Sequence, residues 1–275
     1  MLWVLALLFF IAPAAPAQTA ATATTLTLDQ QEEFLAKAKI IKEGPAKKGI
    51  TNTVRATLSD GTITHDASIQ TIDERRPRFD GPMGPVYNFR DTYKFNIAAS
   101  RLAGLLGLSS MVPLSIERRY KGNTASYTWW VDDVLGDEGA RLSKKITPPD
   151  SESYARQEQI KRVFDQLIYN WDRNQGNTLF DKNWRLWMID HTRAFKLFNQ
   201  PKSPKNLAPQ CARGLLEGLR RLDQATLAAA TRDLLSPGQV KGLLARRDFI
   251  VAHYDKRIRE LGEDAVLYEL PSRVD

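Results

Sequence analysis

YNWDRNQGNTLFDKNWRLWMIDHTRAF, residues 169–195, is the most informative segment of the chain. It opens with a polar run that is typical of a loop and that places Asp172 and Asn177 five residues apart. Two short apolar runs follow, separated by the turn-like tetrapeptide Asp-Lys-Asn-Trp, and this pattern predicts a short hairpin. Because a tight hairpin brings its outer ends together, we expect Asn177 and Asp190 to meet beside Asp172.

Two carboxylates and one amide in such a place suit the transfer of a phosphoryl group to a hydroxyl. The transferred group needs positioning and charge neutralisation more than covalent chemistry. Mg²⁺ is a hard cation that binds through few protein oxygens and keeps part of its water shell. One carboxylate and one amide oxygen can therefore hold the metal, while the second carboxylate accepts the proton of the attacking hydroxyl.

The motifs N-W-D-R-N-Q-G-N and D-H-T in this segment resemble the catalytic loop H-R-D-x-x-x-x-N and the D-F-G of the protein-kinase-like superfamily. The Asp-Arg-Asn-Gln-Gly-Asn form is most similar to its atypical branches, the phosphatidylinositol-kinase-like, HipA-like and Fam20-like secretory kinases. The resemblance implies Asp172 as catalytic base and Asn177 and Asp190 as ligands of Mg²⁺ or Mn²⁺, with ATP as substrate.

The order of predicted elements extends the resemblance over roughly residues 38 to 260. It implies an α+β, two-lobed protein-kinase-like fold. A small antiparallel β lobe with one helix would span 29–135, and a mainly helical large lobe with the catalytic loop and C-terminal helices would span 136–275. The alternative is a polar loop and a hairpin in an unrelated α+β protein.

The small lobe contains four runs with β-strand character. Residues 53–58 and 62–72 flank Asp60-Gly61, a strong hairpin signal, and 111–118 and 125–131 form a second pair.

Helices and an irregular insert complete the predicted small lobe. Asp29 is expected to cap a first helix, and Asp91 or Thr92 to cap a second. Residues 74–87 are rich in proline, glycine and arginine, and we expect an irregular insert or flap beside the cleft.

The resemblance places the nucleotide beneath this lobe. Lys47, Lys48 and Gly49 lie where a glycine-bearing loop would cover the phosphates, although an ordinary loop is the alternative. Trp130 and Val131 lie at the expected hinge between lobes, where backbone groups would meet an adenine. The alternative for this hinge segment is a tryptophan pair that fills the core.

Two positions depart from the kinase pattern. A lysine on a strand and a glutamate on the following helix are expected, and the nearest residues are Gln70 and Asn96. Losing only the lysine would leave a buried unpaired glutamate, which is costly, whereas two neutral amides can bond each other. We therefore expect an amide pair. It favours an alternative function, a catalytically inactive kinase-like binding module, unless Lys47, Lys48 or Lys94 takes over the phosphate contact.

Three residues beside the motifs have supporting roles in this interpretation. Arg173 is expected to hold a carboxylate or phosphate through two hydrogen bonds. His191 either lines the site or is structural, and Trp171, in the position usually taken by arginine, is expected to pack. A metal-dependent hydrolase would use the same carboxylates, but no histidine cluster supports it.

Composition narrows the range of partners. The chain has 275 residues, 43% of them hydrophobic, which suffices for two lobes with a sizeable core. A net charge of +7 favours acidic partners such as nucleotides, and the absence of a basic tract with interleaved aromatics argues against nucleic acid. The expected partners are a nucleotide and an unidentified hydroxyl acceptor. Cys211, the single cysteine, cannot form an internal disulfide and is expected to be structural.

The N-terminal segment is typical of a secretory signal peptide. Residues 1–12 are almost wholly apolar and precede a run of small residues that ends at Ala17. We expect cleavage near Ala17, a disordered lead-in over 18–28, and export to the periplasm or secretion. The apolar core is short for spanning a bilayer, so no membrane span is expected in the mature chain, although an uncleaved anchor is the alternative.

Overall fold

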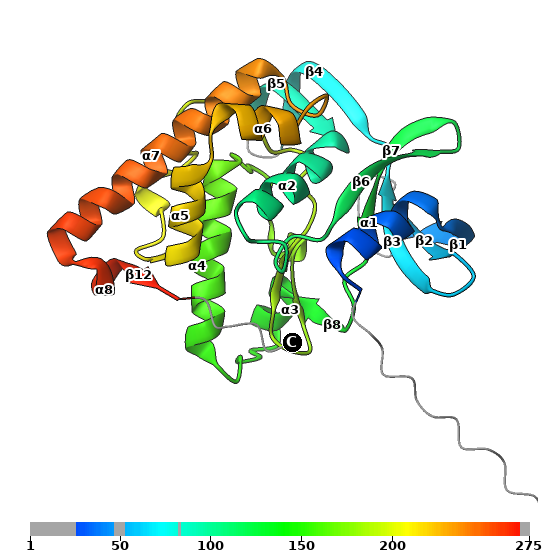
Figure 1. The fold of residues 1–275 in the computed structure, drawn as a ribbon, viewed down its shortest axis with the longest axis horizontal. Helices are drawn as coiled ribbons and strands as arrows, with labels where there is room; N and C mark the ends of the chain where they lie inside the picture. Colours follow the sequence, from blue (N-terminus) through cyan, green and yellow to red (C-terminus); the bar gives the residue numbers. More distant parts are fainter. Residues whose placement is uncertain (1–25, 47–52, 82–83, 270–275) are drawn as a thin grey trace, which may run out of the picture.

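The computed structural model describes residues 26–46, 53–81 and 84–269. Its first layer is a five-stranded antiparallel sheet in the order β1-β2-β3-β7-β6 (Figure 1). The strands are β1 (Lys39–Pro45), β2 (Val54–Ser59), β3 (Thr64–Gln70), β6 (Ser115–Tyr120) and β7 (Asn123–Trp129). The two predicted strand pairs are confirmed. The strand β1, which ends just before the lysine-bearing loop, was not predicted.

Helix α1 (Leu28–Lys37) covers one face of this sheet. Phe34 and Leu35 pack there against the buried side chains of β2, β3 and β7. The helix begins two residues earlier than predicted, because the cap is Thr27 and not Asp29. The Thr27 hydroxyl accepts from the Gln30 N–H, and the Gln30 side chain accepts from the Thr27 N–H.

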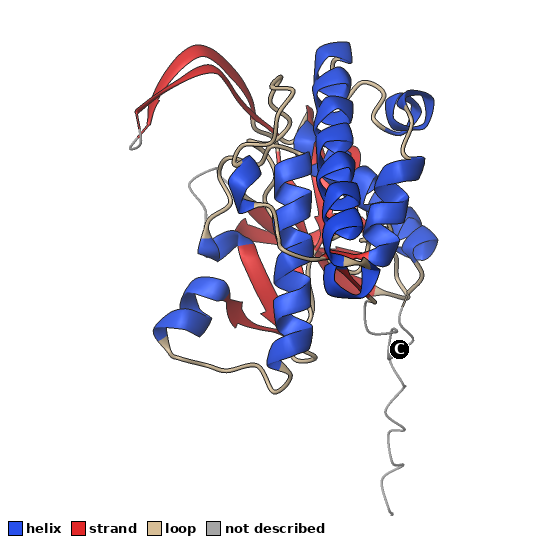
Figure 2. Ribbon diagram, turned by 90° about the vertical axis from the view of Figure 1, so that its left-hand side faces the viewer, coloured by secondary structure: helices blue, strands red, loops and turns tan. Residues whose placement is uncertain are grey.

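A long hairpin of β4 (Asp73–Gly81) and β5 (Gly84–Thr92) projects from the body of the protein (Figure 2). The prediction of an irregular insert was wrong here, since the two strands pair from Asp73↔Thr92 to Gly81↔Gly84. Both strands are edge strands of a two-stranded sheet, and a proline is tolerated on an edge because its missing N–H need not face a partner.

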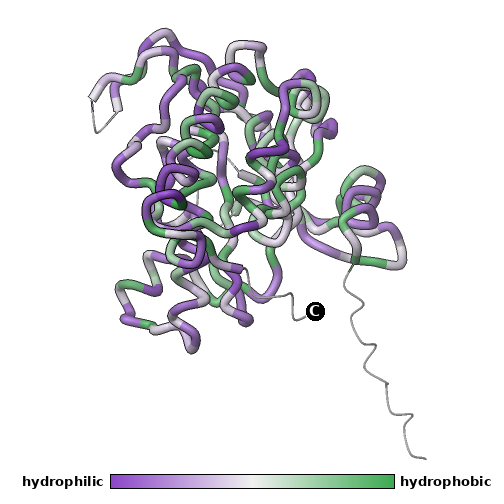
Figure 3. The backbone as a smooth tube through the Cα atoms, turned by 60° about the vertical axis from the view of Figure 1, so that its left-hand side comes forward, coloured by the Kyte–Doolittle hydropathy of each residue, from purple (hydrophilic) through white to green (hydrophobic). Residues whose placement is uncertain are grey.

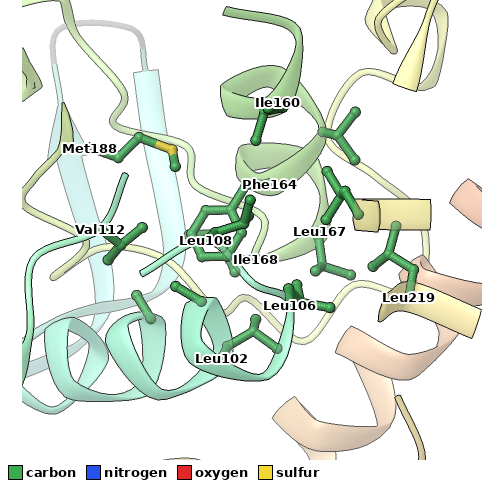
Figure 4. Packing of buried hydrophobic residues seen from close by; sticks show 14 of the residues in the cluster. Leu102, Leu106, Leu108, Val112, Ile160, Phe164, Leu167, Ile168, Met188 and Leu219 are labelled. Atoms are coloured by element: carbon green, nitrogen blue, oxygen red, sulfur yellow. The ribbon is translucent and has the colours of Figure 1, made fainter. Parts of the chain in front are cut away.

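Helix α2 (Lys94–Leu105) follows the hairpin directly and lies between the sheet and the helical layer. Its apolar residues pack with α4 (Ser151–Leu167) in the larger of two buried clusters (Figure 4). The N-cap residue is Tyr93, which makes no side-chain cap bond, so the predicted cap at Asp91 is wrong. The Thr92 hydroxyl does accept the N–H of Lys94, the first residue of the helix, over 3.3 Å. The helix ends before Gly107, whose φ of +72° suits a residue without a side chain.

The second layer is mainly helical. It begins with β8 (Val134–Asp137) and α3 (Glu138–Ser143). After α4 come β9 (Thr178–Asp181) and β10 (Leu186–Met188), which form a small sheet in the order β10-β9-β8. The C-terminal part consists of β11 (Cys211–Ala212), α5 (Arg213–Arg221), α6 (Gln224–Ala230), α7 (Pro237–Leu261), α8 (Glu263–Val266) and β12 (Leu267–Tyr268).

The helices are amphipathic, and their colour alternates between hydrophobic and hydrophilic along the chain in Figure 3. In α5, for example, Leu215, Leu216 and Leu219 are buried and face the core. Cys211 is also buried, and burial raises the pKa of its thiol to about 12, which fits the structural role expected of it. Across residues 26–46, 53–81 and 84–269, no helix combines the length and the apolar character needed to cross a bilayer.

Candidate active site

The predicted hairpin positions two of the three motif residues. Strands β9 and β10 pair antiparallel, and the Ile189 N–H donates to the Asn177 carbonyl over 3.1 Å. Asn177 precedes the first strand and Asp190 follows the second closely, so the structure brings them to the same end of the hairpin. The loop that carries Asp172 leads into this end from α4.

Arg173 connects that end of the hairpin to α4. Its guanidinium donates to both carboxylate oxygens of Asp165, from Nε to Oδ2 and from Nη2 to Oδ1, each over 3.0 Å. Its Nη1 donates to the carbonyls of Asn177 (2.6 Å) and Ile189 (2.7 Å). The side chains of Arg173 and Asp165 are 10% and 11% exposed. The expected hold on a carboxylate is present, and it fixes the loop that carries Asp172 and both hairpin ends together.

Asp172 is held by a residue that sequence reasoning missed. Arg193 Nη1 donates to Asp172 Oδ2 over 2.9 Å, and Arg193 Nε donates to Asp91 Oδ2 over 2.6 Å. Asp91 lies at the end of β5 and is buried, whereas the Asp172 side chain is 37% exposed. The carboxylate of Asp172 is therefore oriented by Arg193 and still reachable from solvent.

Asp190 has a strained backbone and an enclosed side chain. Its φ is +55°, a left-handed conformation that is uncommon for residues other than glycine and is often found at functional sites. Burial raises the pKa of its carboxyl group and the nearby Asp91 adds to this, while a 3.1 Å hydrogen bond from the Thr192 hydroxyl and the charge of Arg173 act against it. A cation beside Asp190 would favour the ionised carboxylate.

The expected amide pair is present. Asn96 Nδ2 donates to Gln70 Oε1, and Gln70 Nε2 donates to the Thr53 hydroxyl over 3.1 Å. Asn96 Oδ1 accepts the backbone N–H of His191 over 2.8 Å. These bonds link β3, α2 and the residue after Asp190 without any charged group.

The ring of His191 packs into the core, which supports the structural alternative. It is 2% exposed and lies edge-on to Phe164, with ring centroids 6.1 Å apart. Burial lowers its pKa well below the usual value, with a smaller contribution from Arg173, so the ring is neutral at physiological pH.

The residues expected around a nucleotide are placed only in part. Val131 is 8% exposed and belongs to the core. Trp130 is partly exposed, donates its N–H to the Asp66 carbonyl over 3.1 Å, and is covered by the Arg55 guanidinium 4.3 Å from its ring centroid. Lys47, Lys48 and Gly49 lie outside the described residues.

Few side chains at this end of the hairpin could hold a metal ion. In the described part of the chain, no cluster of three or more His, Cys, Asp or Glu side chains is arranged to hold a metal ion. Asp190 and the Asn177 side chain are oxygen donors at one end of the hairpin. Such a small set fits Mg²⁺ or Mn²⁺ in the form that keeps waters and binds substrate phosphates, and it does not fit a fully protein-ligated ion.

No protein-family model matches the chain, and no curated protein matches its sequence. Solved structures do match. Hydra Fam20 with sugar aligns at a TM-score of 0.63 and 16% identity, over 88% of this chain and 92% of that chain. The Golgi casein kinase aligns at a TM-score of 0.64 and 13% identity, over 89% and 80%. The same kinase with Mn/ADP bound aligns at a TM-score of 0.63 and 12% identity, over 90% of this chain and 80% of that chain. The chain therefore has the atypical protein-kinase-like fold of the Fam20 and Golgi casein kinases, as residues 169–195 predicted.

Proposed function

We propose that the protein binds ATP with Mg²⁺ or Mn²⁺ and transfers the γ-phosphoryl group to a hydroxyl acceptor. The observation that carries the proposal is the Arg173 contact set, which holds the catalytic loop and both ends of the β9–β10 hairpin in one place. The likeness of the fold to a kinase solved with Mn/ADP bound adds support for nucleotide and metal.

Each motif residue has one role in this proposal. Asp190 and the Asn177 side chain hold the metal, which neutralises phosphate charge and orients the transferred group. Asp172 accepts the proton of the acceptor hydroxyl while the oxygen of that hydroxyl bonds to the γ-phosphorus. The bond between the γ-phosphorus and the bridging oxygen breaks at the same time, and ADP leaves with that oxygen. Arg193 keeps the Asp172 carboxylate in one orientation.

The Gln70–Asn96 pair decides how the nucleotide is held. A lysine in place of Gln70 would contribute a positive charge to the phosphates, and the neutral pair contributes none. Charge neutralisation then rests more heavily on the metal, with Lys47, Lys48 and Lys94 as the candidate cations. We expect nucleotide binding to depend strongly on divalent metal for this reason.

The site of action is proposed to be outside the cytoplasm, in the periplasm or the medium. The proposal rests on the apolar residues 1–12 and the small-residue run to Ala17, which are typical of a signal peptide.

The test is a titration of the mature chain, beginning at Gln18, with ATP in the presence and absence of Mg²⁺ or Mn²⁺. Metal-dependent binding is expected for the wild type and for Asp172→Asn, and it is expected to be lost in Asp190→Asn. The exposed Asp264→Asn is the matched control for the loss of one carboxylate. The wild type but not Asp172→Asn should transfer phosphate. A folded wild-type protein that binds no ATP would contradict the proposal and favour the catalytically inactive binding module.

A further inference from the structure

Four buried polar atoms without a hydrogen-bond partner gather beside Asp172. Among the described residues such atoms include Arg90 Nε, Asp91 Oδ1, Trp171 Nε1 and Lys196 Nζ. Buried polar groups in folded proteins are nearly always paired with protein, water or ligand. Several unpaired atoms at one place are therefore unusual, and they suggest that a ligand or ordered water binds there.

Two of these residues, Trp171 and Lys196, lie around the ring of Phe89 at the base of the β4–β5 hairpin. The guanidinium of Arg90 lies 5.5 Å from the ring centroid of Phe95. Lys196 Nζ lies 5.7 Å from the ring centroid of Phe89 and 5.2 Å from that of Trp171, and the two rings meet edge to face at 6.2 Å. Arg90 and Asp91 directly follow Phe89 on β5. We call Phe89, Arg90, Asp91, Trp171 and Lys196 the hairpin-base cluster.

The unpaired atoms of the cluster are mainly donors. The indole of Trp171 and the ammonium of Lys196 can only donate hydrogen bonds, and the guanidinium of Arg90 likewise. The one unpaired acceptor is Asp91 Oδ1, and the other oxygen of that carboxylate already binds Arg193. A group rich in acceptors and carrying negative charge complements this set.

The surroundings of Lys196 also favour binding of a negatively charged group. Its ammonium is buried over two aromatic faces, a favourable but weak contact. Among residues 26–46, 53–81 and 84–269, no carboxylate lies within ion-pair distance of it. Its pKa is lowered to about 8, mainly by burial and then by the charges of Arg193 and Arg90, while Asp91 acts in the opposite direction. A buried ammonium gains most from an anion that supplies both charge and hydrogen bonds.

We propose that the hairpin-base cluster binds one anionic group, a carboxylate or a phosphate, beside the catalytic base. Trp171 immediately precedes Asp172, and Arg193 contacts Asp172 as well as Asp91, so a group bound here lies next to the acceptor hydroxyl. The anion is either part of the acceptor or a free inorganic anion. Only the first source rests on the proposed function; the site itself does not.

The first experiment measures binding of inorganic phosphate without divalent metal, with ionic strength matched by chloride. Asp190→Asn serves as the background, so that the proposed metal site contributes nothing. Phosphate is expected to raise the melting temperature and to bind at least about tenfold more weakly to Lys196→Met, which loses the charge. Lys196→Arg keeps a charged donor and is expected to retain binding. Lys205→Met, at an exposed lysine, is the matched control.

Two outcomes overturn the proposal. Equal phosphate binding by Lys196→Met and the control would place the anion elsewhere. No binding by a folded Lys196-containing protein would mean that ordered water satisfies these atoms. Either result leaves the ATP titration unaffected, so failure of this site and failure of the proposed function are distinguishable.

The second experiment separates the two sources of the anion. Small hydroxyl compounds are compared in matched pairs, one member with a carboxylate and the other with the corresponding amide. If the group belongs to the acceptor, the carboxylate member alone competes with phosphate, and Lys196→Met abolishes the difference within each pair. If phosphate binds and neither member competes, the site takes a free inorganic anion.

Discussion

The side chain of Asn96 joins Gln70 on β3 to the backbone N–H of His191, the residue after Asp190. One amide thus makes two buried hydrogen bonds, donating to Gln70 and accepting from His191. A lysine–glutamate pair in this place would need two desolvated charges, whereas the amides need none. The position of α2 relative to the segment that carries Asp190 is therefore maintained by neutral groups, and this link does not depend on pH.

Removing that amide should destabilise the protein. Asn96→Ala leaves Gln70 Oε1 and the His191 N–H unpaired in the interior, and each buried unpaired group costs about 1–3 kcal/mol. We expect the free energy of unfolding to fall by roughly 2–4 kcal/mol in urea titrations. Asn199→Ala, at an exposed asparagine, should change it little. Equal effects of the two variants would contradict a structural role for the pair.

Replacing the amides by charges gives a second test. Gln70→Lys alone buries an unpaired ammonium and should cost about 3–5 kcal/mol of stability. Adding Asn96→Glu supplies the partner, and the double variant should recover a large part of that loss. If the proposed nucleotide site is correct, the double variant also binds ATP more tightly than the wild type at low metal concentration. A double-mutant cycle of urea unfolding measures the coupling, and additive effects would show that the two positions do not interact.

The local parts of this site could be predicted from the sequence, and the long-range parts could not. Asn177 and Asp190 were found because a hairpin places its ends together whatever the rest of the chain does. The amide pair was expected only because the resemblance supplied a distant partner for Gln70.

The bond between Arg193 and Asp91 joins residues 102 positions apart, and no local pattern indicates it. The β4–β5 hairpin was missed for a different reason. Its proline and glycine content is typical of irregular structure, and pairing of two edge strands tolerates both.

Arg173 should be as important for stability as for the site. Arg173→Met removes one partner of a buried ion pair and leaves the Asp165 carboxylate uncompensated, which costs about 3–5 kcal/mol. A lysine has too few donors in the right plane to replace both the carboxylate and the carbonyl contacts. Arg173→Lys should therefore retain only part of the stability that Arg173→Met loses. Urea unfolding measures both variants, with Arg162→Met at an exposed arginine as control. A small loss for Arg173→Met would mean that the hairpin end is held without it.

Arg193 offers a test of catalytic positioning. Arg193→Gln removes the guanidinium that orients Asp172 without touching Asn177 or Asp190. If the protein transfers phosphate as proposed, its kcat should fall by about 10–100-fold, the effect of misplacing one reacting group. The affinity for ATP with metal should stay close to that of the wild type, and Arg221→Met, at an exposed arginine, should change neither. An unchanged kcat would show that Asp172 needs no such support.

Lys196 makes stability depend on pH in the alkaline range. Its pKa is lowered from the usual 10.5 to about 8, first by burial and then by Arg193 and Arg90, with Asp91 opposing them. Below about pH 8 the folded and unfolded chains both carry the proton, so the cost of burying the charge is fully present. Between about pH 8 and 10.5 the unfolded chain binds more protons than the folded one, so the free energy of unfolding should rise with pH.

Urea unfolding of the wild type and of Lys196→Met, each at about pH 7.5 and about pH 9.5, checks this expectation. The titrations of all other groups are shared by the two proteins and cancel in the difference between them. The wild type should gain roughly 1 kcal/mol relative to Lys196→Met over that interval, a value that discounts the shift for screening of the exposed part of the side chain. Saturating phosphate should reduce the gain, because an anion beside Lys196 stabilises its protonated form. A loss of stability with rising pH, relative to Lys196→Met, would mean that the ammonium is already paired in the folded protein.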